Sequence, residues 1–165
     1  WIPDHELARA AGLAVDPASG SPRIDASMRT DREGVFAVGN LVHPADTADV
    51  AALDGAAAVG HVLQFLRGGT TWPSAYVDLV VDAPLRWVSP SRIAVDDGAP
   101  PRGRLGLWVD ELVRLPVVTV HQDGRLVSRT RVPWPAAPGR VFRVPSSVLD
   151  AVDRAGGPIT LALER

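Results

Sequence analysis

The sequence predicts an α+β fold, in which a mixed first part is followed by a part made mostly of β-strands. Two observations predict it. Residues 47–67 have the Ala- and Leu-rich composition of a long helix, whereas residues 76–165 carry apolar side chains at alternating positions, typical of half-buried strands. Residues 69–75 are rich in Gly, Thr and Pro, which predicts a linker. We therefore expect a segment 1–68, a linker 69–75 and a β-rich domain 76–165.

Composition excludes several classes of protein. The chain has 165 residues, of which 46% are hydrophobic and 22% charged, so a core can form. Its net charge of −2 predicts no nucleic-acid partner, and no apolar run is long enough to predict a membrane span. The chain has no cysteine, which excludes disulfides, thiol nucleophiles and thiolate metal sites within it.

The basic residues and the first residues of the sequence indicate what kind of protein the chain comes from. All 17 basic residues are Arg, which is typical of a GC-rich bacterial genome. The sequence begins with Trp1 and runs directly into structured-looking sequence, so we expect it to be part of a longer protein. No basic and apolar leader opens it, and the expected location is the cytoplasm.

The first part predicts two helices and two strands. A short helix is expected over residues 4–11, ended by Gly12, and a turn over residues 16–22. Residues 23–25 predict a short strand, and residues 34–39, apolar and bounded by glycines, predict a buried parallel strand. The helix expected over residues 47–67 is apolar on almost all sides, so it should be covered on several sides.

The second part predicts a small antiparallel sandwich or barrel of roughly six or seven strands with one short helix. Asp123-Gly124 lies between two alternating runs and predicts a type I′ hairpin. The short helix is expected over residues 147–155, with Ser147 and Asp150 as a capping box and Gly156 after its end. Apolar residues at every second position are expected to lie on one face of their strand. Three such sets occur: Val77, Leu79 and Val81; Leu105, Leu107 and Val109; Ile159, Leu161 and Leu163.

The most informative stretch is residues 30–40. It places Gly39-Asn40 at the carboxyl end of the predicted buried strand, where ligands bind in α/β sheets. A glycine there lets the backbone approach a ligand closely. The start of the following helix, near Thr47, offers free N–H groups and the positive end of its dipole. Together these features are what a flavin or a nucleotide needs.

The same stretch resembles the second FAD-binding segment of the two-dinucleotide-binding-domain flavoproteins, the pyridine nucleotide–disulfide oxidoreductase superfamily. The matching motifs occur in order, beginning with the aromatic-x-Pro-x-x-x-Leu pattern of residues 1–7. Thr30, the Gly-Val-Phe-Ala-Val-Gly run of residues 34–39 and the Ala-rich residues 51–58 follow. The resemblance spans residues 1 to 67.

A narrower resemblance comes from residues 39–46, which combine Gly-Asn with His and Asp in the following loop. They are similar to the amine- and amino-acid-oxidising subgroup, which includes subunits of opine oxidase and hydrogen cyanide synthase. Chains of that subgroup continue into a small β-rich domain, which residues 76–165 resemble. The implied fold is the C-terminal piece of a Rossmann-like FAD-binding domain followed by a small β-rich, sandwich-like domain.

The resemblance implies roles for four residues. Gly39 and Asn40 would face the ribityl–phosphate part of FAD, and the backbone N–H groups near Thr47 and Ala48 would point at the pyrimidine edge of the flavin. An N–H there stabilises negative charge on the reduced ring. Asn40 departs from the family's commoner Asp, which changes the electrostatics of the site.

The expected cofactor is FAD in the full-length parent, with NAD(P) left open as a second cofactor. Expected partners are the upstream FAD and NAD domains of the same protein, or another oxidoreductase subunit. The Gly-x-Gly-x-x-Gly loop that binds the FAD pyrophosphate is not in this chain, so residues 1–165 alone should bind FAD poorly. No catalytic acid, base or redox residue is identified.

The sequence also allows simpler interpretations than an FAD-binding segment. The chain could instead be a non-catalytic interaction module or a degenerate remnant that mediates subunit or domain contacts. His43, Asp46 and Asp49 predict a helix-capping loop rather than a metal site. Two sets of arginines, Arg102 and Arg104 and then Arg125, Arg129, Arg131, Arg140 and Arg143, predict solvated strand faces in preference to an anion-binding face. Trp72, Trp87, Trp108 and Trp134 predict core and rim packing, with contact to a partner domain as the alternative.

Overall fold

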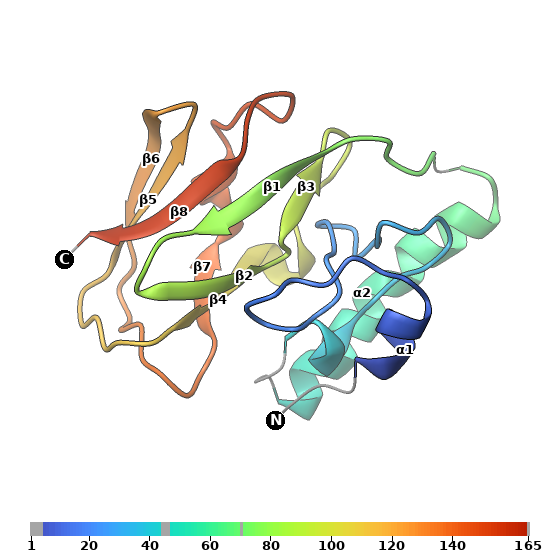
Figure 1. Ribbon diagram of the computed structural model, residues 1–165, viewed down its shortest axis with the longest axis horizontal. Coiled ribbons are helices and arrows are strands. Elements are labelled where there is room, and N and C mark those ends of the chain that lie inside the picture. The colour runs from blue at the N-terminus through green and yellow to red at the C-terminus, as the bar shows by residue number, and fades with distance from the viewer. Residues whose placement is uncertain (1–4, 44–46, 70, 165) are drawn as a thin grey trace.

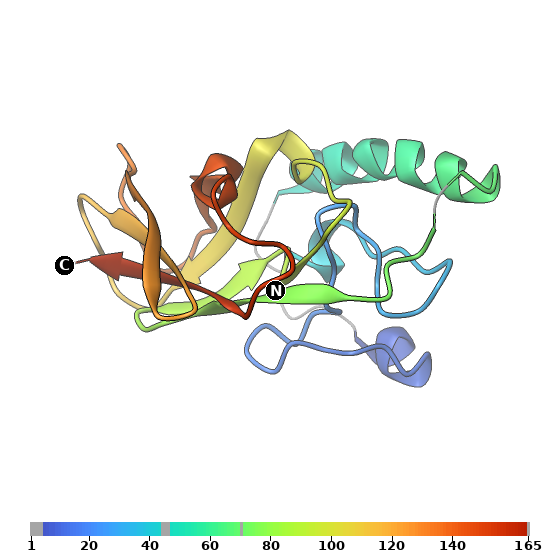
Figure 2. The same cartoon turned by 90° about the horizontal axis from the view of Figure 1, so that it is seen from above.

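A computed structural model of the chain describes residues 5–43, 47–69 and 71–164. It shows a mixed α/β molecule with two sheets and few helices, in agreement with the α+β class (Figure 1). The first part holds helix α1 (Glu6–Ala10), the 3-10 helix η1 (Gly39–Leu41) and the long helix α2 (Ala48–Leu66). Seen from above, part of the loop region of residues 13–38 lies between α1 and α2 (Figure 2).

The second part consists of strands that form two sheets. The larger sheet has five strands in the order β3-β1-β8-β5-β6, and the smaller has three in the order β2-β4-β7. The strands are β1 (Tyr76–Val81), β2 (Leu85–Ser89), β3 (Arg92–Ala94), β4 (Arg104–Val109), β5 (Val117–Gln122), β6 (Arg125–Arg131), β7 (Phe142–Pro145) and β8 (Ile159–Glu164). Two further 3-10 helices, η2 (Pro101–Gly103) and η3 (Ser146–Leu149), flank β4 and β7.

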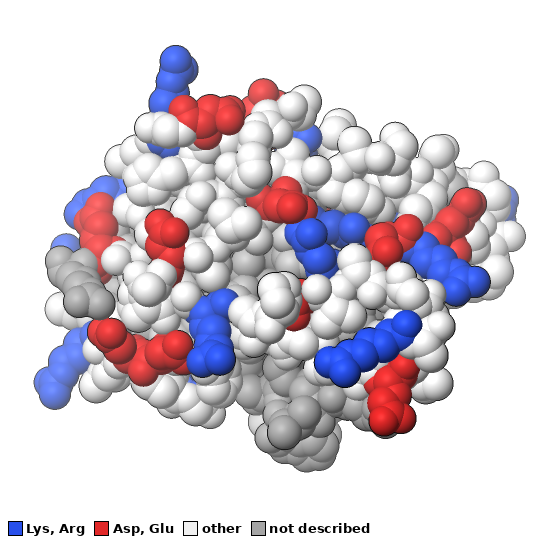
Figure 3. All heavy atoms as spheres, in the orientation of Figure 1, with Lys and Arg blue, Asp and Glu red and all other residues white. Residues whose placement is uncertain are grey.

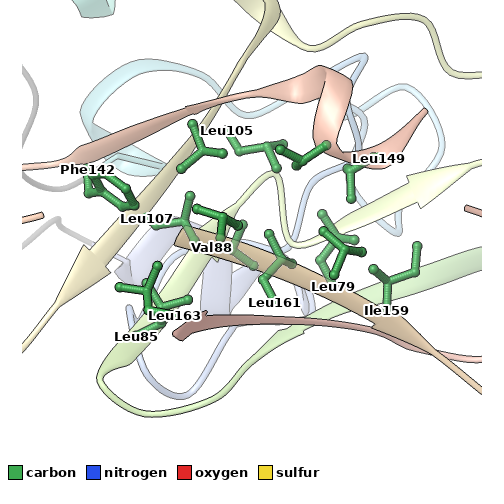
Figure 4. Packing of buried hydrophobic residues seen from close by; sticks show 14 of the residues in the cluster. Leu79, Leu85, Val88, Leu105, Leu107, Phe142, Leu149, Ile159, Leu161 and Leu163 are labelled. Carbon is green, nitrogen blue, oxygen red and sulfur yellow. The ribbon is translucent and has the colours of Figure 1, made fainter. Parts of the chain in front are cut away.

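The alternating apolar residues fill the space between the two sheets, as the sequence predicts. Leu105, Leu107 and Val109 on β4 are fully buried, and they face Ile159 and Leu161 on β8 across the core (Figure 4). Burying each of these side chains contributes about 1.5–3 kcal/mol. This core is the main source of stability of residues 76–164.

The Asp123-Gly124 hairpin is confirmed. Both residues have positive φ, 50° and 74°, which is the backbone of a type I′ turn. Strands β5 and β6 pair on either side of it, with Gln122 opposite Arg125. The twist of this turn matches the twist of the two strands, so it fixes their register.

Two expectations for the β-rich part are wrong. The sheets are not wholly antiparallel, because β8 pairs with β1 in parallel, with Leu79 opposite Ile159. The helix expected over residues 147–155 is only the short η3, without a side-chain cap bond. The side chain of Gln122 explains this: it donates to the carbonyls of Asp153 (2.7 Å) and Gly157 (2.9 Å), and Asp153 N–H donates back to it (2.8 Å). These bonds hold the segment as turns.

In the first part the two helices are confirmed and the two strands are wrong. Helix α2 begins and ends within one residue of the expected range 47–67, and Thr47 and Arg67 are its caps. Residues 23–25 form no strand, and of residues 34–39 only Phe36 forms an isolated antiparallel bridge, with Arg29. The physical reason is that no neighbouring strand lies beside them in the described part of the chain, so their backbone groups bond within the loop instead, Ala37 N–H to Met28 O for example.

Helix α2 is covered on one side only. Val50, Asp54 and Ala58 are buried, whereas the opposite side carries exposed Val59, Leu63 and Leu66. Their exposed fractions are 53%, 42% and 72%. The cover expected on several sides is therefore not supplied by the residues that the structure describes.

A buried ionic network joins the two parts. Arg29, 3% exposed, donates to Asp25 (2.7 Å) and Asp97 (3.0 Å), and also to the more exposed Asp96. The Asp25 carboxylate accepts the backbone N–H groups of Ser27 and Arg29, and the Asp97 carboxylate accepts those of Ala26 and Ala94. Burial, followed by the charge of Asp97, raises the pKa of the Asp25 carboxyl, while hydrogen bonds from Arg29 oppose that rise.

The surface charge is mixed. In Figure 3, Arg side chains and acidic side chains occur in small neighbouring groups over the visible face, without a continuous basic stripe. Among the described residues, no helix has the length and apolar character needed to cross a membrane.

We predict that Leu107→Ala lowers the free energy of unfolding by about 2–5 kcal/mol, because it leaves a cavity between the sheets. Leu115→Ala is the matched control, since Leu115 is 72% exposed, and should change that free energy by less than about 0.5 kcal/mol. Urea unfolding followed by circular dichroism measures both. Equal losses in the two variants would contradict the observed core.

We further predict that Arg29→Met destabilises the protein by about 3–5 kcal/mol, because Asp25 and Asp97 would stay buried without their cation. Arg129→Met removes an arginine from the exposed Arg129–Glu164 pair and should leave the denaturant midpoint nearly unchanged. The same unfolding assay compares them, and a fully stable Arg29→Met variant would show that the network is dispensable.

Candidate functional site

The predicted cofactor residues Gly39 and Asn40 lie in η1, against the first turns of α2. Gly39 is buried and has a φ of 66°. A Cβ placed on it would lie 3.3 Å from the Cβ of Ala51, so both the backbone angle and the close helix contact require glycine here. Asn40 is half-buried beside it.

Thr47 and Ala48 form the start of α2 and are exposed. Thr47 is the N-cap in an extended conformation, with φ −82° and ψ 162°. A hydrogen bond from its side chain lowers the pKa of Asp49, and the charge of Arg143 acts in the same direction. The structure therefore brings Gly39 to the first turn of α2. Residues 44–46, which include Asp46 of the loop, lie outside the described residues.

A polar contact that sequence reasoning missed lies on the buried side of α2. Asp54 is 1% exposed and accepts a hydrogen bond from Arg102 on η2. His43 Nε2 lies 3.4 Å from the other carboxylate oxygen of Asp54. This cluster links the η1–α2 loop to the β-rich part. The available signal was Asp54, the second of two Asp residues in the helix, which stands among apolar and small residues away from the first turn.

The described residues contain no group of three or more His, Asp or Glu side chains arranged to hold a metal ion. His43 and Asp49 do not gather: His43 contacts Asp54, whereas Asp49 lies in the exposed first turn of α2.

An open cavity lies beside the start of α2. Its volume is about 480 Å³, within the range of small-molecule sites. Four arginines share its wall with apolar side chains; the lining residues are Val50, Arg102, Arg104, Trp134, Pro135, Arg140, Val141, Phe142 and Arg143. None of these lining residues is acidic.

This arrangement differs from the expected solvated strand faces. Arg125, Arg129 and Arg131 do lie exposed on β6. By contrast, Arg104 on β4 and Arg143 on β7 lie on one face of the smaller sheet and line the same cavity as Val50 of α2. The sequence could not show this because it depends on the pairing of β4 with β7, which are more than thirty residues apart.

The tryptophans pack within the chain. Trp87 and Trp108 stack across β2 and β4 with ring centroids 6.0 Å apart. Trp72 of the linker contacts Phe36 (5.3 Å) and Phe65 (5.5 Å) and donates its indole N–H to Thr30 O. The linker is thereby held against both α2 and the residue 30–36 loop.

Comparison with known proteins gives no relative for this chain: no family model, no curated protein and no solved structure matches it significantly. The resemblance to FAD-dependent oxidoreductases stays a prediction that depends on the motif residues.

We predict that Gly39→Ala destabilises the protein by about 1 kcal/mol or more beyond Gly12→Ala. Both glycines have φ near 70°, so both substitutions strain the backbone by about 1–2 kcal/mol. Only at Gly39 does the new methyl group also meet α2, since nothing lies within 4 Å at Gly12. Urea unfolding of the pair isolates the helix contact, and equal losses would mean that η1 does not pack tightly on α2.

Proposed function

We propose that this chain contributes the second FAD-binding segment of an FAD-dependent oxidoreductase. The substrate of the parent protein would be an amine or amino acid, or NAD(P)H would act as the reductant, and a hydride would pass from it to the flavin. Residues 1–67 would belong to the FAD-binding domain of Rossmann-like fold, and residues 76–165 to the small β-rich domain that follows it.

The observation that carries this proposal is the position of Gly39. Its positive φ and its contact with Ala51 place the Gly39-Asn40 backbone beside the first turn of a 19-residue helix. A glycine and a short polar residue at a helix start suit close approach by a cofactor with phosphate and hydroxyl groups. The Thr30 and Gly34 motif residues lie in the same loop, next to Phe65 and Trp72.

The test starts from the visible absorption spectrum of the full-length natural protein. Flavin bands that persist through gel filtration are the expected result. A colourless protein that stays colourless after FAD is added would refute the proposal. Residues 1–165 alone are expected to bind FAD poorly, because the Gly-x-Gly-x-x-Gly loop lies elsewhere in proteins of this kind.

We predict that Asn40→Ala weakens FAD binding by the full-length protein roughly tenfold, because one hydrogen bond to the cofactor is lost. Asn40→Asp places the family's commoner residue there and should keep FAD bound. Leu126→Ala, an exposed change on β6, is the control and should have no effect. Fluorescence titration of the flavin-free protein measures all three, and equal affinities would remove Asn40 from the site.

One observation favours the alternative, an interaction module that mediates subunit or domain contacts. Val59, Leu63 and Leu66 form an exposed apolar stripe at helical spacing along α2, on the side opposite its buried residues. The same stripe also suits the oxidoreductase proposal, in which an upstream domain of the same protein covers it.

We predict that residues 1–165 associate in solution through this stripe, and that the double change Val59→Glu and Leu63→Glu shifts them to monomers in gel filtration with light scattering. Both side chains are largely exposed, so the variant should fold normally. Leu126→Glu, 54% exposed on β6, is the control. Association that survives the double change would place the interface elsewhere.

A further inference from the structure

We propose that the arginine-lined cavity beside the start of α2 binds a small organic dianion, either a dicarboxylate or a phosphate ester. This site is built by β4, β7 and the residue 134–141 loop, and it does not depend on a bound flavin. It lies apart from Gly39 and Asn40, which do not line it.

Strand register brings two of the arginines together. In the antiparallel pair of β4 and β7, Arg104 lies opposite Pro145 and Gly106 opposite Arg143. Arg104 and Arg143 are therefore diagonal neighbours on one face of the sheet, a spacing that long side chains bridge. The other face carries Leu105, Leu107 and Val144 and points into the core.

Gly106 allows close packing on the face that carries Arg104 and Arg143. A Cβ at this position would lie 3.2 Å from Val141 and 3.4 Å from His43 Nδ1. Because Gly106 has no side chain, Val141, just before β7, and His43, in the η1–α2 loop, can approach β4 closely. This approach places the arginines of β4 and β7 next to the first turn of α2.

The charges in the wall are only partly balanced. Arg102 bonds to Asp54, and Arg143 lies near enough to Asp49 to lower the pKa of that carboxyl, after the larger effect of the Thr47 hydrogen bond. Arg104 and Arg140 form no ion pair with any carboxylate in residues 5–43, 47–69 and 71–164. Among the described residues, two positive charges at this cavity thus have no carboxylate partner, and a dianion would neutralise them.

The rest of the wall makes those charges effective. The Arg104 guanidinium lies 5.2 Å from the ring centroid of Trp134, whose indole N–H donates to Arg143 O (2.9 Å). These contacts orient Arg104 before any ligand binds. Val50, Pro135 and Phe142 supply an apolar surround, and a charge pair in such surroundings is stronger than one in open water.

The guanidinium group also sets the chemistry of the ligand. Its planar N–H fork pairs two-to-two with the oxygens of a carboxylate or of a phosphate. The cavity volume of about 480 Å³ admits a metabolite-sized molecule.

Calorimetric titration of the full-length protein tests this proposal with succinate, inorganic phosphate and glycerol 3-phosphate at constant ionic strength. We expect saturable binding of at least one dianion and binding of acetate that is roughly tenfold weaker or more. Tighter binding of succinate would identify a dicarboxylate as the ligand, and tighter binding of glycerol 3-phosphate a phosphate ester. No saturable binding of any dianion would overturn the proposal.

Variants locate the site. The double change Arg104→Gln and Arg140→Gln should weaken the bound dianion at least tenfold, whereas Arg104→Lys, which keeps the charge, should weaken it less. Arg125→Gln with Arg131→Gln removes two exposed arginines of β6 and is matched in charge. Equal weakening by the two double changes would reduce the effect to net charge and overturn the proposal. Titrations with and without flavin separate this site from the proposed FAD site, and circular dichroism checks that each variant is folded.

Discussion

The structure depends on one buried ionic cluster, in which Arg29 holds Asp25 and Asp97 together. Arg29 comes from the loop between the two helices, and Asp97 from the turn after β3. Each carboxylate also accepts backbone N–H groups. The same two carboxylates therefore satisfy backbone donors in the residue 26–29 loop of the first part and at Ala94 of the β-rich part. Charges buried at this depth are tolerable only while all partners are present, so the two parts of the chain hold each other's loops in place.

The candidate site follows from that junction. Because the residue 24–30 loop is fixed on the β-rich part, η1 and the start of α2 lie against β4 and η2 rather than apart from them. Asp54 of α2 bonds to Arg102 of η2, and His43 lies within van der Waals reach of the open position at Gly106. Gly39 and the arginine-lined cavity thus occupy neighbouring sides of one helix start.

Helix α2 has one buried side and one exposed apolar side, and the exposed side bears on both functional proposals. Its buried side packs on η1, and Asp54 on that side accepts a hydrogen bond from Arg102 of η2. The opposite side exposes Val59, Leu63 and Leu66 to solvent. An apolar stripe of this length is costly to leave in water. Contact with another domain or another chain would remove that cost, and both the oxidoreductase and the interaction module supply such a contact.

The sequence by itself determined the elements whose signals are local. Alternating apolar residues predicted the strand faces of the core, and Asp123-Gly124 predicted its hairpin. The Ala-rich run from Thr47 to Arg67 predicted α2 to within one residue at each end. The placement of Gly39 and Asn40 at the end of a strand was wrong, because they lie in η1, and only their nearness in the chain to Thr47 and Ala48 was visible in the sequence. Their role in holding FAD stays a prediction.

Only the tertiary structure decided what depends on partners far away in the chain. Residues 34–39 look like a buried strand but form a loop, since a strand needs a neighbour to accept its hydrogen bonds. The helix expected over residues 147–155 does not form, because the side chain of Gln122 donates to the carbonyls of Asp153 and Gly157, which lie 31 and 35 residues later in the chain. The cavity could not be foreseen either: Arg104 and Arg143 meet through strand register, and register is set by packing of the whole sheet rather than by any local pattern.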